Sequence, residues 1–323
     1  MLELPEIVTI EATQKTSFQI IPNCEYDYKS NKEIKEFSEK PVNKRFEIAT
    51  KLSLKSKNGN NKKQKPSGLS FNELGFGENI YIIGNNHNIY ITNEMKGTKK
   101  QMMVSVRYLN DTNVIVQNFI EGARGLARTW EGQDNSAERN VISGTMKHFG
   151  IIRGAGDCPY FSYSPTMHNT NDANRWHKKV NTAAKLIAEQ LFPDTLNSIQ
   201  STMDFHDIFI PEIIGGKHGL CSEMVQSQHA LVTEPHVDID SSKCLSIWTV
   251  EPGKETRTDG WYFVLPYLTC RFNGKEFNGV AVKLRHGTGI EWDGRFLFHC
   301  STAPNDKRVN VHGTYFGMTR NSM

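Results

Sequence analysis

The stretch that decides the fold runs from residue 244 to residue 316. It contains the short apolar runs CLSIWTV (244–250), WYFVL (261–265), YLTCRF (267–272), VAVKL (280–284), RFLFH (295–299) and RVNVHGTYF (308–316). Turn-rich segments such as PGKETRTDG (252–260) and NGKEFNG (273–279) separate these runs. Many short strands joined by Gly, Pro and Asn turns are typical of a sandwich, barrel or jelly roll, not of alternating strand–helix units. We therefore predict an all-β C-terminal third.

Immediately before this region, the sequence predicts one packing helix near residues 174–192. Apolar residues follow the spacing i, i+4, i+7, i+8 from Trp176 to Leu191, and Pro193 is expected to end the helix. The predicted fold class is α+β, with a C-terminal jelly roll buttressed by helices and a mixed N-terminal region.

The N-terminal part has no internal repeat, and we assign residues 1–120 to a mixed α/β region and residues 121–323 to the core. The lysine-rich segment KSKNGNNKKQKPSG (55–68) has little to bury, so it is expected to be a loop. It is either simply solvated or a nuclear-import or phosphate-contacting patch. Residues 79–92 resemble a β-hairpin around Gly-Asn-Asn-His, and MMVSVRYL (102–109) and NVIVQNF (113–119) resemble further strands. The segment EGARGLARTWEG (121–132) is expected to be an exposed loop.

Composition limits the class of protein. Of 323 residues, 37% are hydrophobic and 23% are charged, which fits neither a disordered chain nor a membrane protein. The six cysteines are scattered without a CxxC pair, and no export signal is visible, so we expect reduced thiols and an intracellular protein. The net charge of +3 neither demands nor excludes a polyanionic partner.

Candidate metal ligands lie in the β region. His236 and Asp238 form an H-x-D pair, and residues i and i+2 of a strand face the same side. His299, at the end of the run WDGRFLFH, is expected where a later strand returns beside the first. Two imidazoles and one carboxylate form the facial triad that leaves open positions on Fe(II). The alternative is that both histidines are ordinary hydrogen-bonded residues.

A candidate anion anchor follows nine residues after His299. The guanidinium of Arg308 suits bidentate binding of a carboxylate. Strand alternation places Arg308, Asn310 and His312 on one face. Arg308 could instead be a surface charge, and Lys307 could take the same role.

Together, these residues resemble the Fe(II)/2-oxoglutarate-dependent dioxygenases. The resemblance covers about residues 170–320 and implies a double-stranded β-helix with Fe(II), 2-oxoglutarate and O₂. It implies that His236, Asp238 and His299 ligate iron and that Arg308 and Asn310 bind the co-substrate. The segment DGWYFVLP (259–266) looks like the G-x-F-x-L-P strand of the TET/JBP-like branch, which oxidises the methyl group of 5-methylpyrimidines in nucleic acid.

The sequence also departs from the family pattern, because Arg308-Val309-Asn310 stands where Arg-x-Ser is usual, so a related acid could replace 2-oxoglutarate. If methylated DNA is the substrate, Arg124, Arg128 or the tract 55–65 would contact phosphates, and the protein would be nuclear; otherwise it would be cytoplasmic. The alternatives are a protein or small-molecule hydroxylase and an inactive β-barrel that only binds.

Overall fold

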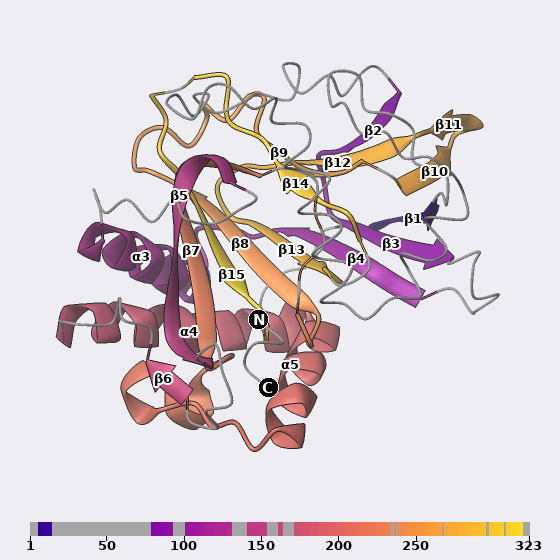
Figure 1. Cartoon of the computed structure of the whole chain (residues 1–323). Helices are drawn as coiled ribbons and strands as arrows, with labels where there is room; N and C mark the ends of the chain where they lie inside the picture. Colours follow the sequence, from indigo (N-terminus) through magenta and orange to yellow (C-terminus); the bar gives the residue numbers. More distant parts are fainter. Residues whose placement is uncertain are drawn as a thin grey trace, which may run out of the picture.

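A computed structural model gives the arrangement of the chain (Figure 1). It describes residues 6–14, 79–92, 101–130, 141–153, 161–163, 171–233, 236, 238, 240–266, 268–294, 297–306 and 308–318. The lysine-rich tract 55–68, Lys307, Cys24 and Cys158 lie outside these residues. None of the described helices is both long and apolar enough to span a bilayer.

The C-terminal strands form two facing sheets between which the chain alternates. The larger sheet contains the strand order β13-β8-β15-β7, and the smaller sheet contains β14-β9-β12. The segment after β7 joins the smaller sheet through a bridge between His236 and His299. This alternation is the topology of a double-stranded β-helix, so the predicted fold class is confirmed. The strands are β7 (Glu223–Thr233), β8 (Cys244–Val250), β9 (Tyr262–Leu265), β12 (Gly279–Lys283), β13 (Thr288–Trp292), β14 (Cys300–Ser301) and β15 (Val311–Phe316).

Further strands extend both sheets. The larger sheet has eleven strands in the order β11-β10-β1-β3-β4-β13-β8-β15-β7-β5-β6, and β2 is the fourth strand of the smaller sheet. The predicted hairpin at 79–92 is wrong, because β2 pairs with β12 while β3 pairs with β1 and β4. These strands are β1 (Val8–Gln14), β2 (Ile80–Ile83), β3 (His87–Thr92), β4 (Gln101–Tyr108), β5 (Val141–Arg153), β6 (Phe161–Tyr163), β10 (Leu268–Phe272) and β11 (Lys275–Phe277).

Helices cover the outer face of the larger sheet (Figure 1). They are α3 (Val114–Thr129), α4 (Asn171–Leu191) and α5 (Pro193–Phe205), followed by the short helices η2 (Glu212–Ile214) and η3 (Gly216–His218). The helix predicted near 174–192 is confirmed as α4, which begins three residues earlier. Pro193 ends α4 and also starts α5, because proline is well accommodated in the first helical turn.

The prediction of an exposed loop at 121–132 and of a strand at 113–119 is wrong, because both segments contribute to α3. Asn113 caps this helix by accepting a hydrogen bond from the Ile115 backbone N–H, at 2.9 Å. Gly122 and Gly125 lie within α3 and are not turn residues. A Cβ at Gly125 would lie 2.2 Å from the Trp176 ring, so glycine allows α3 to approach α4 closely.

Two hydrophobic cores result, one on each face of the larger sheet. The first lies between this sheet and the helices and includes Phe119, Phe149 and Ile187. The second fills the interior of the β-helix and includes Trp248, Trp261, Trp292 and other residues. The division at residue 120 stays a prediction; residue 120 lies within α3, and β4 pairs with β13 of the core.

Candidate metal centre

The three predicted ligands lie together at one end of the β-helix. Nε2 of His236 is 3.4 Å from Oδ1 of Asp238, and Nε2 of His299 is 3.2 Å from Oδ2 of the same carboxylate. The two imidazole centroids are 4.5 Å apart. One ligand atom from each of the three residues falls within a mutual distance of 4.8 Å, which suits a single cation. The structure therefore brings the predicted triad together.

Backbone hydrogen bonds fix the two histidines against each other. The His236 N–H donates to the His299 carbonyl at 3.0 Å, and the His299 N–H donates back to the His236 carbonyl at 2.9 Å. His299 thus begins the short segment that continues into β14. The prediction that it ends a strand starting at Trp292 is wrong, because β13 stops at Trp292.

Asp238 is held from the opposite side by the turn after β13. Its backbone N–H donates to the Gly294 carbonyl at 2.9 Å. A Cβ on Gly294 would lie 2.4 Å from Oδ2 of Asp238, so only glycine leaves room for the carboxylate here. The aspartate side chain is thereby directed at the two imidazoles.

The hydrogen bonding of His299 suits a cation at this centre. Nδ1 of His299 lies 2.9 Å from the Leu297 carbonyl, an acceptor only, so Nδ1 carries the hydrogen and Nε2 presents a lone pair. That lone pair faces Oδ2 of Asp238, which is buried and has no hydrogen-bond partner among the described residues. In this tautomer, a cation between Nε2 of His299 and Oδ2 of Asp238 would satisfy both atoms. The donor set, two imidazoles and one carboxylate, fits a divalent transition metal.

Two neighbouring aspartates differ in their protonation. Burial alone would raise the pKa of Asp238, but His299 and His236 lower it well below its usual range. The pKa of Asp240 is raised well above its usual value, chiefly by burial and then by the charge of Asp238. Asp238 therefore keeps its negative charge to lower pH than Asp240 does.

Asp240 belongs to a hydrogen-bonded group that the sequence did not reveal. Oδ2 of Asp240 accepts from the Cys244 thiol, at 2.8 Å, and from the Tyr315 hydroxyl. Burial raises the pKa of the Cys244 thiol well above its ordinary value, so this sulfur stays protonated. Asp238, Asp240 and Cys244 also lie close enough to hold a cation, but the Cys244 thiol keeps its proton. The alternating motif H-x-D-x-D (236–240) could have indicated that Asp240 lies on the same side of the chain as His236 and Asp238.

Aromatic rings enclose His299. Phe263 stacks on its imidazole, with centroids 5.4 Å apart and an interplanar angle of 25°. Trp292 meets it edge-on at 5.3 Å, and Tyr315 packs against Trp292 at 5.6 Å. These residues come from β9, β13 and β15, so three strands immobilise one ligand.

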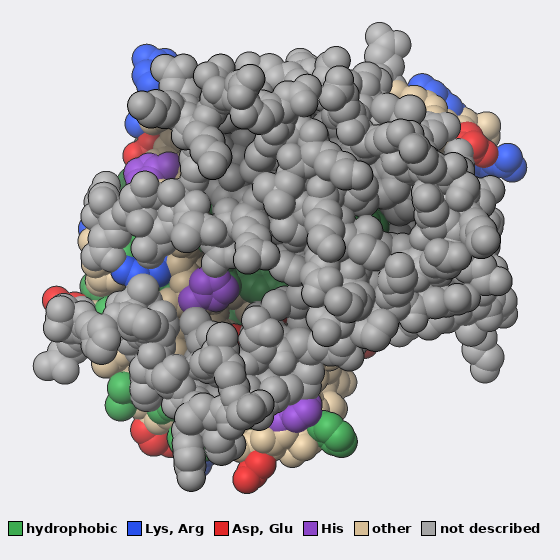
Figure 2. Space-filling model, in the orientation of Figure 1, with side chains coloured by type: hydrophobic (Ala, Val, Ile, Leu, Met, Phe, Trp, Pro, Cys, Tyr) green, Lys and Arg blue, Asp and Glu red, His purple; other side chains and the backbone are tan. Residues whose placement is uncertain are grey.

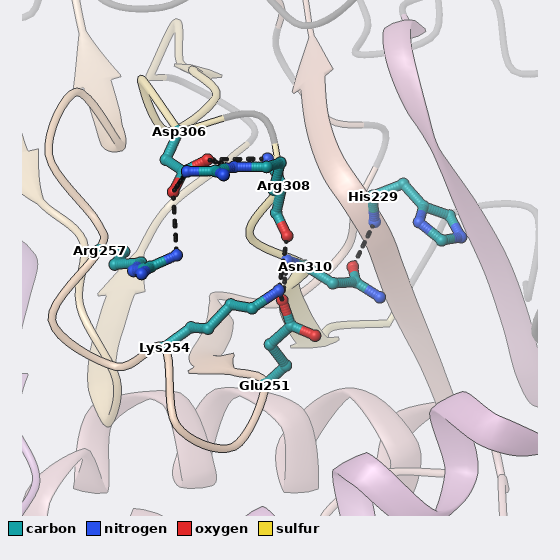
Figure 3. A network of polar contacts seen from close by, with 7 residues as sticks. All are labelled: His229, Glu251, Lys254, Arg257, Asp306, Arg308 and Asn310. Atoms are coloured by element: carbon teal, nitrogen blue, oxygen red, sulfur yellow. Dashed lines mark hydrogen bonds and ion pairs between the residues drawn. The ribbon is translucent and has the colours of Figure 1, made fainter.

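The structure does not bring Arg308 to this centre. Its side chain is 80% exposed, and its guanidinium donates to both carboxylate oxygens of Asp306 at 3.0 and 3.3 Å (Figure 3). The strand predicted to start at Arg308 begins only at Val311, and the buried side chains of this segment include Val309 and Val311 but not Arg308. The prediction of a buried guanidinium at position 308 is therefore wrong.

Asn310 also takes part in the surface network, not in the centre. Its Oδ1 accepts from the His229 backbone N–H at 2.9 Å, and its own N–H donates to Glu251 at 2.8 Å (Figure 3). Lys254 pairs with Glu251 at 2.8 Å and donates to the Arg308 carbonyl. This network ties the loop after β8 to the turn before β15.

The two arginines predicted to contact DNA phosphates differ in their surroundings. Arg124 donates to the Val250 carbonyl at 2.6 Å and pairs with Glu255 at 3.2 Å, so it is engaged within the protein. Arg128 is exposed in the last turn of α3. In Figure 2, the visible Lys and Arg side chains of the described residues are scattered and form no continuous patch on this face.

Comparisons with known proteins found similarity only at the level of structure. The sequence matches no protein-family model and no curated protein. The structure is similar to NgTET1 in complex with 5mC DNA, with a TM-score of 0.48 and 11% identity over 87% of this chain and 90% of that chain. It is also similar to a Pseudomonas putida prolyl-4-hydroxylase, with a TM-score of 0.34 and 12% identity over 67% of this chain and 92% of that one. At this identity neither similarity carries a substrate over to this chain.

Proposed function

We propose that this protein is an Fe(II)- and 2-oxoglutarate-dependent dioxygenase that hydroxylates a C–H bond. The observation that carries the proposal is that Nε2 of His299 and Nε2 of His236 converge on the two carboxylate oxygens of Asp238, at 3.2 and 3.4 Å. This arrangement stands at one end of a double-stranded β-helix. A metal bound there would retain open positions for O₂ and a chelating acid.

The protein residues would have distinct roles. His236, Asp238 and His299 would hold the metal, and the Leu297 carbonyl would keep His299 in the tautomer that presents Nε2. Bound iron would supply O₂ activation: one oxygen atom goes to the C–H carbon and the other to succinate, as 2-oxoglutarate loses CO₂. The apolar rings of Phe263 and Trp292 would exclude water from the ligand side of the site.

As substrate we infer the methyl group of 5-methylcytosine or thymine in DNA. The sequence resemblance of residues 259–266 to the TET/JBP-like branch supports this choice. The same segment forms β9, whose Phe263 stacks on His299, so the resemblance falls next to the proposed metal. A base would have to leave the helical stack to reach this site. A nuclear location would follow from a DNA substrate.

The second candidate is a protein or small-molecule hydroxylase built on the same core. It is favoured by the position of Arg124, because this predicted phosphate contact is engaged by Glu255 and the Val250 carbonyl. A third reading, a barrel that only binds, would not require an intact triad.

One experiment separates these readings. The protein is incubated with Fe(II), 2-oxoglutarate, O₂ and methylated or unmethylated DNA, and succinate and digested nucleosides are quantified by mass spectrometry. We expect oxidation of 5-methylcytosine only with methylated DNA, or oxidation of thymine with both DNA samples, and no oxidised methyl group with His299→Ala. His218→Ala, which changes an exposed histidine away from the site, is the matched control. Succinate without nucleoside oxidation would favour the second candidate, and neither product in any arm would refute the dioxygenase proposal.

A further inference from the structure

The tryptophans of this chain differ in the bonding of their indole N–H groups. Trp130, in the core next to the helices, donates to Oε1 of Gln226 at 2.8 Å. Trp248, Trp261 and Trp292, all in the core inside the β-helix, have buried Nε1 atoms with no acceptor among the described residues. More than nine in ten buried polar groups are paired in folded proteins, so three unpaired donors in one compartment require an explanation.

Two of these donors belong to the neighbouring strands β13 and β8 of the larger sheet. Trp292 contacts the His299 ring and pairs in register with Cys244 of β8. Trp248 lies four residues further along β8, so its side chain is on the same inward face, deeper in the β-helix. The chain makes room for this ring at Gly313, where a Cβ would lie 2.6 Å from Trp248.

Trp261 packs against Trp248. Its ring meets Trp248 edge-on, with centroids 5.7 Å apart. The relative exposures of Trp248, Trp261 and Trp292 are 7%, 0% and 2%. The indoles therefore occupy fixed positions within the same core.

The chemistry of an indole indicates the kind of ligand. An indole N–H only donates, so its partner must be an acceptor. A buried donor without a partner costs about 1–3 kcal/mol of stability, and an acceptor ligand would recover it. At neutral pH a keto dicarboxylic acid presents only acceptor oxygens. A divalent metal and the Asp238 carboxylate together carry one positive charge, so the dianionic acid would retain one net negative charge, which the indole N–H groups would stabilise as hydrogen-bond donors.

We propose that Trp248 and Trp292 donate hydrogen bonds to the keto-acid co-substrate and take the anchoring role expected of Arg308. The inference rests on the proposed function and names the residues that select its acid. Trp261 is a positioning residue that holds the Trp248 ring. The acid would thus be bound by neutral donors inside the β-helix, while Arg308 remains in its surface pair with Asp306.

The test measures binding, not turnover. Calorimetric titration gives the Kd of Mn(II) for the metal-free protein and then the Kd of 2-oxoglutarate for the Mn(II)-loaded protein. The variants are Trp248→Phe, Trp292→Phe and Arg308→Ala, with Trp130→Phe as the matched control outside the β-helix. Because phenylalanine is smaller than tryptophan, the benzothienyl isostere, in which sulfur replaces the indole N–H, is also placed at position 292.

We expect Trp248→Phe, Trp292→Phe and the isostere to weaken 2-oxoglutarate binding about tenfold or more, the loss of one hydrogen bond to a charged acceptor. The Mn(II) affinity should stay unchanged in Trp248→Phe and in the isostere at position 292, which keeps the ring against His299, and Trp130→Phe and Arg308→Ala should bind the acid like the wild type. An unchanged Kd in a tryptophan variant overturns the assignment of that residue. If only Arg308→Ala weakens binding, the inference is wrong while the proposed function stands. Failure of the wild-type protein to bind Mn(II) or the acid would instead refute the proposed function.

Discussion

Replacing His177 with phenylalanine should make the protein less sensitive to acid. His177 lies on α4, is fully buried, and packs edge-on against Phe149 with centroids 6.2 Å apart. Neither ring nitrogen has a hydrogen-bond partner among the described residues. Burial lowers its pKa from 6.5 to about 3, because the protonated ring would be stranded without water.

The expected magnitude follows from this pKa difference. Above pH 6.5 the ring is neutral in both the folded and the unfolded state, so it causes no pH dependence. As the pH falls below 6.5, the unfolded chain binds a proton that the folded protein refuses, and stability is lost. At about 1.4 kcal/mol per pH unit, the loss between pH 7 and pH 5 is about 2 kcal/mol, and it continues toward pH 3.

The assay is urea denaturation at pH 7, 6 and 5, with the free energy of unfolding compared at each pH. His177→Phe should lose about 2 kcal/mol less than the wild type over this range. Other groups, such as His312 with its pKa of about 4, contribute equally to both proteins. His218→Phe, at an exposed position, is the control. Equal slopes for wild type and His177→Phe would refute the claim that His177 is buried in its neutral form.

Three further predictions concern the metal, Arg308 and the helix layer. Mn(II) at a hundred times its Kd should stabilise the wild type by about 2.7 kcal/mol, a Tm increase of about 5 °C in a thermal melt, and His299→Ala should show no increase. Arg308→Ala should leave the KM for 2-oxoglutarate within about twofold, since exposed ion pairs contribute little; a tenfold increase in steady-state assays would contradict the surface placement. Gly125→Ala should destabilise the protein by about 1–3 kcal/mol in urea, because its Cβ would overlap Trp176, whereas Gly84→Ala, with open space around it, should not.

The sequence alone determined those features that depend on local periodicity. The short apolar runs from residue 244 onward predicted the β-helix, and the i, i+4 spacing predicted α4. His236, Asp238 and His299 could be selected as a triad because their residue types limit the chemistry. In each case the prediction rests on the spacing or the type of residues, which can be read without the tertiary structure.

The same local rules failed where glycine has more than one use. The glycine-containing segment 121–132 looked like an exposed loop, although Gly122 and Gly125 allow α3 to pack closely on α4. The strands at 79–92 looked like a hairpin, yet they pair with different partners. Pairing and packing partners are distant in the chain, so no short window of sequence contains them.

Only the tertiary structure decided which face of a strand points inward. Alternation grouped Arg308 with Asn310 and His312, but β15 begins at Val311, and Arg308 is 80% exposed while His312 is buried. The facing sheets select Val309 and Val311 for the interior, and Asp306 holds Arg308 at the surface. The closure of two sheets likewise assembles Asp240, Cys244 and Tyr315 beside the metal ligands, and it collects three indoles in one core. Such groupings arise from distances between strands, which alternation along a single strand cannot encode.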